Sequence, residues 1–133
     1  MPGAEGRVSV RRRLKNALRV PSGRGPARSR AGRDVRLLAA LMVRDDARFL
    51  PGLLRNLAPQ VDGLVALDDG SSDGGDRLLA GNPLVTTLLR NPPDRPGWDE
   101  PGGLRRLTEA ALQSGADWIL VVDADERLER DFR

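Results

Sequence analysis

Two residue types that serve much enzyme and metal chemistry are missing from this chain of 133 residues, which has neither cysteine nor histidine. Without cysteine it can form no disulfide and no thiolate metal site. Without histidine it cannot build a Ser-His-Asp triad or a zinc site with imidazole ligands. Any metal must therefore be held by oxygen atoms, which favours Mg²⁺, Mn²⁺ or Ca²⁺. Acid–base chemistry is left to Asp, Glu, Lys or a group of the substrate.

Long apolar runs are also missing. No run approaches the roughly 20 residues that a membrane-spanning helix needs. The N-terminus lacks the apolar centre of a secretory signal. We therefore expect a cytoplasmic protein.

The net charge of +3 is divided unevenly along the chain. Residues 1–33 carry ten basic residues and one acidic residue, whereas residues 34–133 carry 12 basic and 18 acidic residues. The first segment is rich in Arg, Gly, Pro and Ser and cannot bury enough apolar surface to fold, so we expect a disordered basic arm. Within it, "VRRRLKNALRV" (10–20) is compatible with a short amphipathic helix. Such an arm suits an anionic membrane surface at the inner face of the membrane. Nucleic acid is disfavoured because the arm has no aromatic residue on which bases could stack.

From Asp34 onward, short apolar runs alternate with segments of helical periodicity. Helices are expected from Leu50 to Leu57 with Pro51 in the first turn, from a cap at Asp73 to Leu79, and from Leu104 to a stop at Gly115. A Pro/Gly-rich loop is expected at 91–103. Strands are expected at 35–43, 63–69, 83–90 and 117–122. This alternation predicts an α/β fold with a mostly parallel sheet and helices on both faces.

Acidic residues follow three of the four predicted strands. Ligands of open α/β sheets bind beyond the carboxyl ends of the strands, so these acids are expected to form one anionic crevice. A divalent cation is the expected counter-charge, because no lysine lies in this region. If "DAD" (123–125) is extended, its two carboxylates point to one side and are able to share an ion. The alternative is that these acids only cap helices or lie in solvated turns, above all Asp45, Asp46 and Asp73. The acids concerned are Asp45, Asp46, Asp68, Asp69, Asp123, Asp125 and Glu126.

Three segments resemble family 2 glycosyltransferases, which have the GT-A fold. "MVRDDARFLPGLLRNL" (42–57) is similar to the family's opening strand and helix, although the family usually has Asn-Glu in place of Asp45-Asp46. "VALDDGSSDG" (65–74) resembles its V-x-x-D-D-G-S-x-D-G segment. "ADWILVVDADE" (116–126) resembles its D-x-D strand. The order and spacing of the segments agree with the family, and the resemblance covers about residues 35–133.

The resemblance implies transfer of a sugar from a UDP- or GDP-sugar to an unknown acceptor. It implies that Asp68 contacts the nucleobase and that Asp46 lies near the donor pocket. Asp123 and Asp125 correspond to the D-x-D pair, which holds the ribose and the Mn²⁺ or Mg²⁺ ion that bridges the diphosphate. A cation held in this way neutralises the charge of the leaving nucleoside diphosphate as a Lewis acid.

Two further implications of the resemblance concern the donor contact and the end of the chain. Arg105 or Arg106 matches a position where the family often has a basic contact to the donor, and the choice between them stays open. In the family, the acceptor half and the catalytic base follow the D-x-D strand, whereas this chain ends about ten residues after Asp123. We therefore expect residues 34–133 to be an incomplete, donor-binding half-domain, truncated after the fourth strand and without an assignable catalytic base.

Other classes of protein also fit parts of the pattern. Phosphatases similar to haloacid dehalogenases place Asp-x-Asp after a buried strand, but there the motif opens the domain and is followed by Thr or Val. A phosphoacceptor receiver domain needs a lysine after the acids, and Lys15 is the only lysine. A non-catalytic remnant, or a binding module with a basic arm, is a further alternative. Metal-dependent nucleotide binding distinguishes the transferase from such a remnant or binding module.

Overall fold

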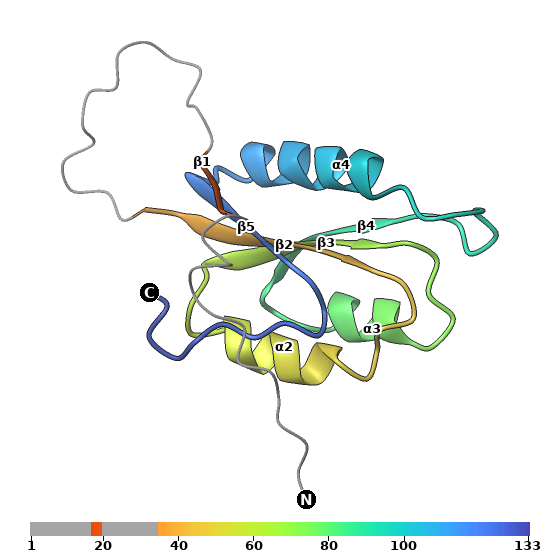
Figure 1. Cartoon of the computed structure of the whole chain (residues 1–133), viewed down its shortest axis with the longest axis horizontal. Coiled ribbons are helices and arrows are strands. Elements are labelled where there is room, and N and C mark those ends of the chain that lie inside the picture. The colour runs from red at the N-terminus through yellow and green to blue at the C-terminus, as the bar shows by residue number, and fades with distance from the viewer. Residues whose placement is uncertain (1–16, 20–34) are drawn as a thin grey trace, which may run out of the picture.

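The computed structural model describes residues 17–19 and 35–133, and it has an α/β fold with a five-stranded sheet (Figure 1). The order of the strands in the sheet is β1-β5-β2-β3-β4. Strands β5, β2, β3 and β4 are parallel to one another, and β1 pairs with β5 in the antiparallel direction. The predicted α/β fold with a mostly parallel sheet is therefore confirmed. The elements are β1 (Ala17–Arg19), β2 (Leu37–Val43), α2 (Leu50–Leu57), β3 (Gly63–Asp68), α3 (Gly75–Ala80), β4 (Val85–Arg90), α4 (Glu100–Gln113) and β5 (Trp118–Val122).

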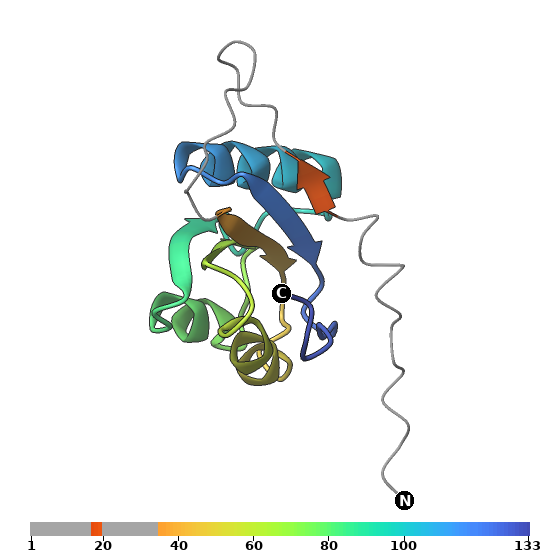
Figure 2. The same cartoon turned by 90° about the vertical axis from the view of Figure 1, so that its left-hand side faces the viewer.

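The helices form two layers around the sheet. Helices α2 and α3 cover one face and α4 covers the other (Figures 1 and 2). The chain runs from β2 through β3 to β4 in one direction and then returns to place β5 on the other side of β2. Crossovers of one hand that run in opposite directions put their helices on opposite faces, which explains the two layers. The reversal creates a topological switch point between β2 and β5, where sheets of this type bind ligands.

The alternation of side chains along β2 divides the core in two. Ala39, Leu41 and Val43 belong to the cluster that includes the buried leucines of α2. Leu38 and Ala40 belong to the cluster under α4. This is the period of two expected of a strand that is buried on both faces. Within the part of the chain that the structure describes, no helix is long and apolar enough to cross a membrane.

Two segments differ from the sequence-based predictions. Helix α4 begins at Glu100, inside the predicted loop, because the Asp99 side chain accepts a hydrogen bond from the Gly102 N–H at 3.0 Å and Pro101 suits a first helical turn. Residues 17–19 form a strand, so the predicted helix is wrong for these three residues. The rest of the predicted basic arm, and its proposed membrane contact, lies outside the described residues. The domain boundary at residue 34 stays a prediction.

Candidate functional site

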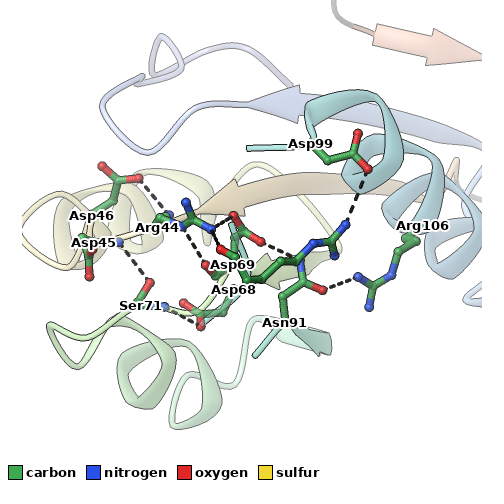
Figure 3. A network of polar contacts seen from close by, with 10 residues as sticks. Arg44, Asp45, Asp46, Asp68, Asp69, Ser71, Asn91, Asp99 and Arg106 are labelled. Atoms are coloured by element: carbon green, nitrogen blue, oxygen red, sulfur yellow. Dashed lines mark hydrogen bonds and ion pairs between the residues drawn. The ribbon is translucent and has the colours of Figure 1, made fainter. Parts of the chain in front are cut away.

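The carboxyl ends of four parallel strands meet at one edge of the sheet, and each is followed by polar residues. Figure 3 shows those that follow β2, β3 and β4, together with Asp99 just before α4 and Arg106 within α4. The parallel register aligns Val43 with Asp68 and Asp68 with Arg90, so the segments after these residues lie next to one another. These following residues are Arg44, Asp45 and Asp46 after β2, Asp69 and Ser71 after β3, Asn91 after β4, and Asp123 and Asp125 after β5.

Asp69 is fully engaged by its neighbours. Its side chain is 2% exposed, and its Oδ2 forms an ion pair with Nη2 of Arg44 at 2.6 Å, with angles outside those of a hydrogen bond. Its Oδ1 accepts a hydrogen bond from Nδ2 of Asn91 at 2.6 Å. Nε of Arg44 also donates to the backbone carbonyl of Asp69 at 2.8 Å. A buried carboxylate requires such partners, so Asp69 organises the edge of the sheet and has no oxygen left for a ligand.

Asp68 is equally buried but only half satisfied. Its side chain is 3% exposed, and its Oδ2 accepts a hydrogen bond from the Ser71 N–H at 3.1 Å. Its Oδ1 has no hydrogen-bond partner among residues 17–19 and 35–133. A buried, unpaired carboxylate oxygen is costly and rare, and in proteins it often marks a functional group. The free oxygen of Asp68 is thus a position for an N–H or O–H donor of a ligand.

The two acidic residues after β2, Asp45 and Asp46, also differ in their hydrogen bonds. Asp45 has a left-handed backbone (φ +55°), and its Oδ1 accepts a hydrogen bond from the Ser72 N–H at 2.7 Å. Its own N–H donates to Oγ of Ser71 at 3.0 Å, so Asp45 joins the end of β2 to the turn after β3. Asp46 is half-buried, and within the described ranges its side chain accepts one long hydrogen bond, from the Arg44 N–H at 3.4 Å. The structure thus gives Asp45 a structural role and leaves Asp46 facing the acidic side of the edge.

The segment after β5 is a turn, so the extended conformation that would have put the carboxylates of Asp123 and Asp125 on one side is not adopted. The Glu126 N–H donates to the Asp123 carbonyl at 3.0 Å, and Oε2 of Glu126 accepts from the Asp123 N–H at 2.9 Å. This reciprocal pair closes the turn. Ala124 is buried while Asp123 and Asp125 are exposed, so both carboxylates still reach solvent.

The surroundings of Asp123 are negative. Desolvation raises the pKa of Asp123 above its ordinary value of 3.8, and the nearby carboxylates of Glu126, Asp125, Glu100 and Asp46 raise it further. Over the described ranges Asp123 has no ion pair with a basic side chain. Like charges from the end of β2, the start of α4 and the end of β5 therefore meet here. A bound cation would relieve their repulsion.

Replacing Asp123 by Asn is expected to stabilise the fold at neutral pH. A carboxyl group whose pKa is raised by folding loses stability as the pH rises from 3.8 through its folded value, and the amide has no such loss. The gain at pH 7 should be a few tenths of a kcal/mol, since the exposed side chain is screened by solvent. It should vanish below pH 3.8, which urea unfolding at both pH values would measure. Asp131→Asn, at an exposed acid away from this turn, is the control, and a less stable Asp123→Asn would contradict the electrostatic explanation.

The carboxylates suit a metal ion that is shared with a ligand. No group of three or more acidic side chains able to hold a metal ion occurs in the described ranges. Asp123 and Asp125 nevertheless offer two exposed carboxylates, and Mg²⁺ is commonly held by one or two carboxylates together with waters and substrate phosphates. The nearby Arg127 donates to the carbonyls of Ala124 at 2.9 Å and Phe49 at 3.1 Å. It therefore secures the turn, and in the described part of the chain both carboxylates are without a basic partner.

The structure separates the two candidate arginines of α4. Arg105 is exposed, whereas Arg106 is half-buried and donates from Nη1 to Oδ1 of Asn91 at 2.5 Å (Figure 3). Arg106 therefore belongs to the polar network at the edge of the sheet. Arg44 and Asn91 were not among the predicted site residues. Each directly follows a strand, and that position was the available signal, but only acidic residues were expected to act there.

Three relatives share part of this sequence, and no family model matches it. Uncharacterized proteins of Mycobacterium tuberculosis and Mycobacterium bovis are each 36% identical to it over 102 residues, which is 74% of this chain and 25% of theirs. A TPR repeat-containing protein of Synechococcus elongatus is 38% identical over 90 residues, which is 66% of this chain and 20% of the relative. The chain thus spans about a quarter of the length of these relatives, or less. None of the three names states a ligand or a reaction.

Proposed function

We propose that residues 35–133 bind a nucleotide-diphosphate sugar together with Mn²⁺ or Mg²⁺, as the donor-binding part of a family 2 glycosyltransferase. The observation that supports this proposal is the buried Oδ1 of Asp68, which lacks a hydrogen-bond partner among residues 17–19 and 35–133 and lies at the carboxyl edge of the parallel strands. The resemblance of three segments to that family supports it. The unneutralised acids across the switch point from Asp68 support a cation there.

The proposed roles combine the resemblance to the family with the contacts of each residue. Asp68 accepts an N–H of the nucleobase, and Asp46 lies beside the donor. Asp123 and Asp125 hold the ribose and the divalent cation, which when bound neutralises the charge of the leaving nucleoside diphosphate. Arg106, rather than Arg105, contacts the donor. We assign no catalytic base within residues 35–133, and the acceptor is undefined.

Calorimetric titration of UDP and GDP into the chain, with Mn²⁺ and with EDTA, tests the proposal. We expect binding that depends on the metal and that is weakened at least about 10-fold in Asp125→Ala, because the carboxylate is lost at an exposed position that the fold does not need. Asp131→Ala removes an equally exposed acid away from the turn and should bind normally. A folded chain that binds neither nucleotide would sink the proposal, and equal binding in EDTA would remove the metal from it.

A further inference from the structure

The segment after β5 runs back along helix α2, beside it in Figure 1. We call residues 124–133 the strap. Asn56 of α2 donates from Nδ2 to the Leu128 carbonyl at 2.9 Å and accepts at Oδ1 from the Leu128 N–H at 2.7 Å. Gln60, just after α2, accepts from the Phe132 N–H at 3.3 Å. The side chains of Leu128 and Phe132 pack against the core cluster that includes the leucines of α2. The strap is therefore attached to α2 by its backbone and by its apolar side chains.

Arg127 of the strap joins the acidic turn to the start of α2. Its Nη1 donates to the carbonyls of Ala124 at 2.9 Å and Glu126 at 2.6 Å, and its Nη2 donates to the carbonyl of Phe49 at 3.1 Å. Phe49 directly precedes α2, whereas the other two carbonyls lie in the turn after β5. A planar guanidinium has five donors in a fixed arrangement, so it can make these bonds at once. One side chain thus fixes the turn to a neighbouring element.

The guanidinium of Arg127 lies over Gly52, in the first turn of α2. A Cβ atom at position 52 would come within 2.7 Å of Nη2 and 3.4 Å of Cζ of Arg127. Any side chain at this position would therefore displace the guanidinium. Glycine is a poor helix former, but it is the one residue type that leaves this space open.

The turn has to be held because its acids repel one another. Desolvation and the nearby carboxylates of Glu126 and Asp125 raise the pKa of Asp123. Arg127 opposes the repulsion through the carbonyls of the turn, since it forms no ion pair with an acid in the described part of the chain. The backbone of the turn is fixed in this way, while the carboxylates of Asp123 and Asp125 stay available to a ligand.

We propose that Arg127, which lies over Gly52, is a positioning residue for the divalent cation at Asp123 and Asp125. This inference rests on the cation site of the function proposed above, and it adds residues that the resemblance does not assign. Two carboxylates hold an ion more tightly when they are already in place, because binding then does not have to order the turn. By its charge alone, Arg127 would repel a cation. Positioning and charge therefore act with opposite signs, and an experiment can separate them.

The test is titration of the full chain with Mn²⁺ alone, followed by the electron paramagnetic resonance signal of the free ion. We expect Gly52→Ala to weaken Mn²⁺ binding about 10-fold, as when residues that orient metal ligands are replaced. This variant changes no charge, and it should fold, because the displaced group is the end of a flexible side chain and alanine favours a helix. Arg127→Met should show a loss of similar size. Arg130→Met removes the same charge from an exposed residue of the strap and should bind Mn²⁺ at least as tightly as the unmodified chain.

The affinity of the folded protein separates a positioning role from a structural one. A variant that is less stable but still almost wholly folded, as thermal unfolding reports, keeps its affinity if the role is only structural. Unchanged affinity in Gly52→Ala would therefore overturn the inference, and so would tighter binding in Arg127→Met. If Arg127→Met does not fold, Gly52→Ala decides alone.

Two further outcomes concern the site itself. Asp125→Ala should lose most of the Mn²⁺ binding, and if it does not, the ion binds elsewhere and the inference is wrong. If the unmodified chain binds no Mn²⁺, both the inference and the metal of the proposed function fail. Titration of UDP in EDTA then still decides whether the chain binds a nucleotide.

Discussion

Replacing Asp68 by Asn is expected to weaken UDP binding by about 100-fold while the fold is retained. The two side chains have the same shape, so packing at this buried position is preserved. What changes is the hydrogen-bonding character of the atom that faces the ligand. The expected loss combines a missing charge-assisted hydrogen bond with a new donor–donor contact.

The orientation of the new amide is fixed by the protein. The Ser71 N–H donates to Oδ2 of Asp68 at 3.1 Å, and it needs an acceptor in the variant as well. The amide oxygen of Asn must therefore take that place, which puts the NH₂ group where the unpartnered Oδ1 stood. A ring N–H of uracil then meets another donor, whereas the ring nitrogen of cytosine meets a donor that it can accept from. Asp68→Asn should therefore weaken the binding of UDP more than that of CDP.

Calorimetry of the Asp68→Asn variant with UDP and CDP, in Mn²⁺, measures both effects. Stability should be equal to or above that of the unmodified chain, because a half-satisfied buried charge is replaced by a neutral group. Asp131→Asn serves as the control for a change of one charge at an exposed site. UDP binding of unchanged strength in Asp68→Asn would show that this oxygen does not contact the base, and the observation that carries the proposed function would lose its meaning.

From residue 35 onward, the sequence was sufficient to predict the order of helices and strands and the edge at which they place polar groups. The leucines of α2 recur at helical spacing, and all four of them are buried (Leu50, Leu53, Leu54 and Leu57). The apolar runs before the acids became parallel strands because the segments between them are long enough for helical crossovers. Parallel strands share one carboxyl edge, so the gathering of residues after β2, β3 and β5 follows from the pattern alone.

The different contacts of the individual site residues could not be predicted in the same way. Asp68 and Asp69 are adjacent and identical in type. The side chains of Arg44 and Asn91, which follow other strands, contact the carboxylate of Asp69 but not that of Asp68. Nothing near Asp69 in the sequence identifies these partners. The turn at residues 123–126 was not predicted for a related reason. Alternation of side chains holds only for an extended backbone, whereas Glu126 closes a turn here. Strand β1 pairs with a segment about 100 residues away, which local periodicity cannot reveal.

Replacing Arg44 by Met is expected to destabilise the fold by about 3 kcal/mol, at the lower end of the cost of breaking a buried ion pair. The variant leaves the carboxylate of Asp69, which is 2% exposed, without its counter-charge. The Asn91 amide cannot replace a full positive charge. The value is at the lower end because Arg44 is itself 30% exposed, so water can partly reach the site. For a domain of this size, such a loss is a large part of the total stability of about 5–15 kcal/mol.

The double variant Arg44→Met/Asp69→Leu distinguishes two contributions to the free energy of unfolding. One is the loss caused by an unpaired Asp69 charge, and the other is the net stabilisation by the ion pair. Removing both charges leaves an apolar pair of similar volume, so we expect a loss of only about 1 kcal/mol, most of it from the unsatisfied Asn91 NH₂ group. The double variant should therefore be more stable than Arg44→Met alone, which urea unfolding measures directly. Arg90→Met, at an exposed arginine of β4, should change stability by no more than about 0.5 kcal/mol. If the double variant is less stable than Arg44→Met, Asp69 stabilises the edge through contacts other than its charge, and its arrangement with Arg44 and Asn91 would have to be explained by packing.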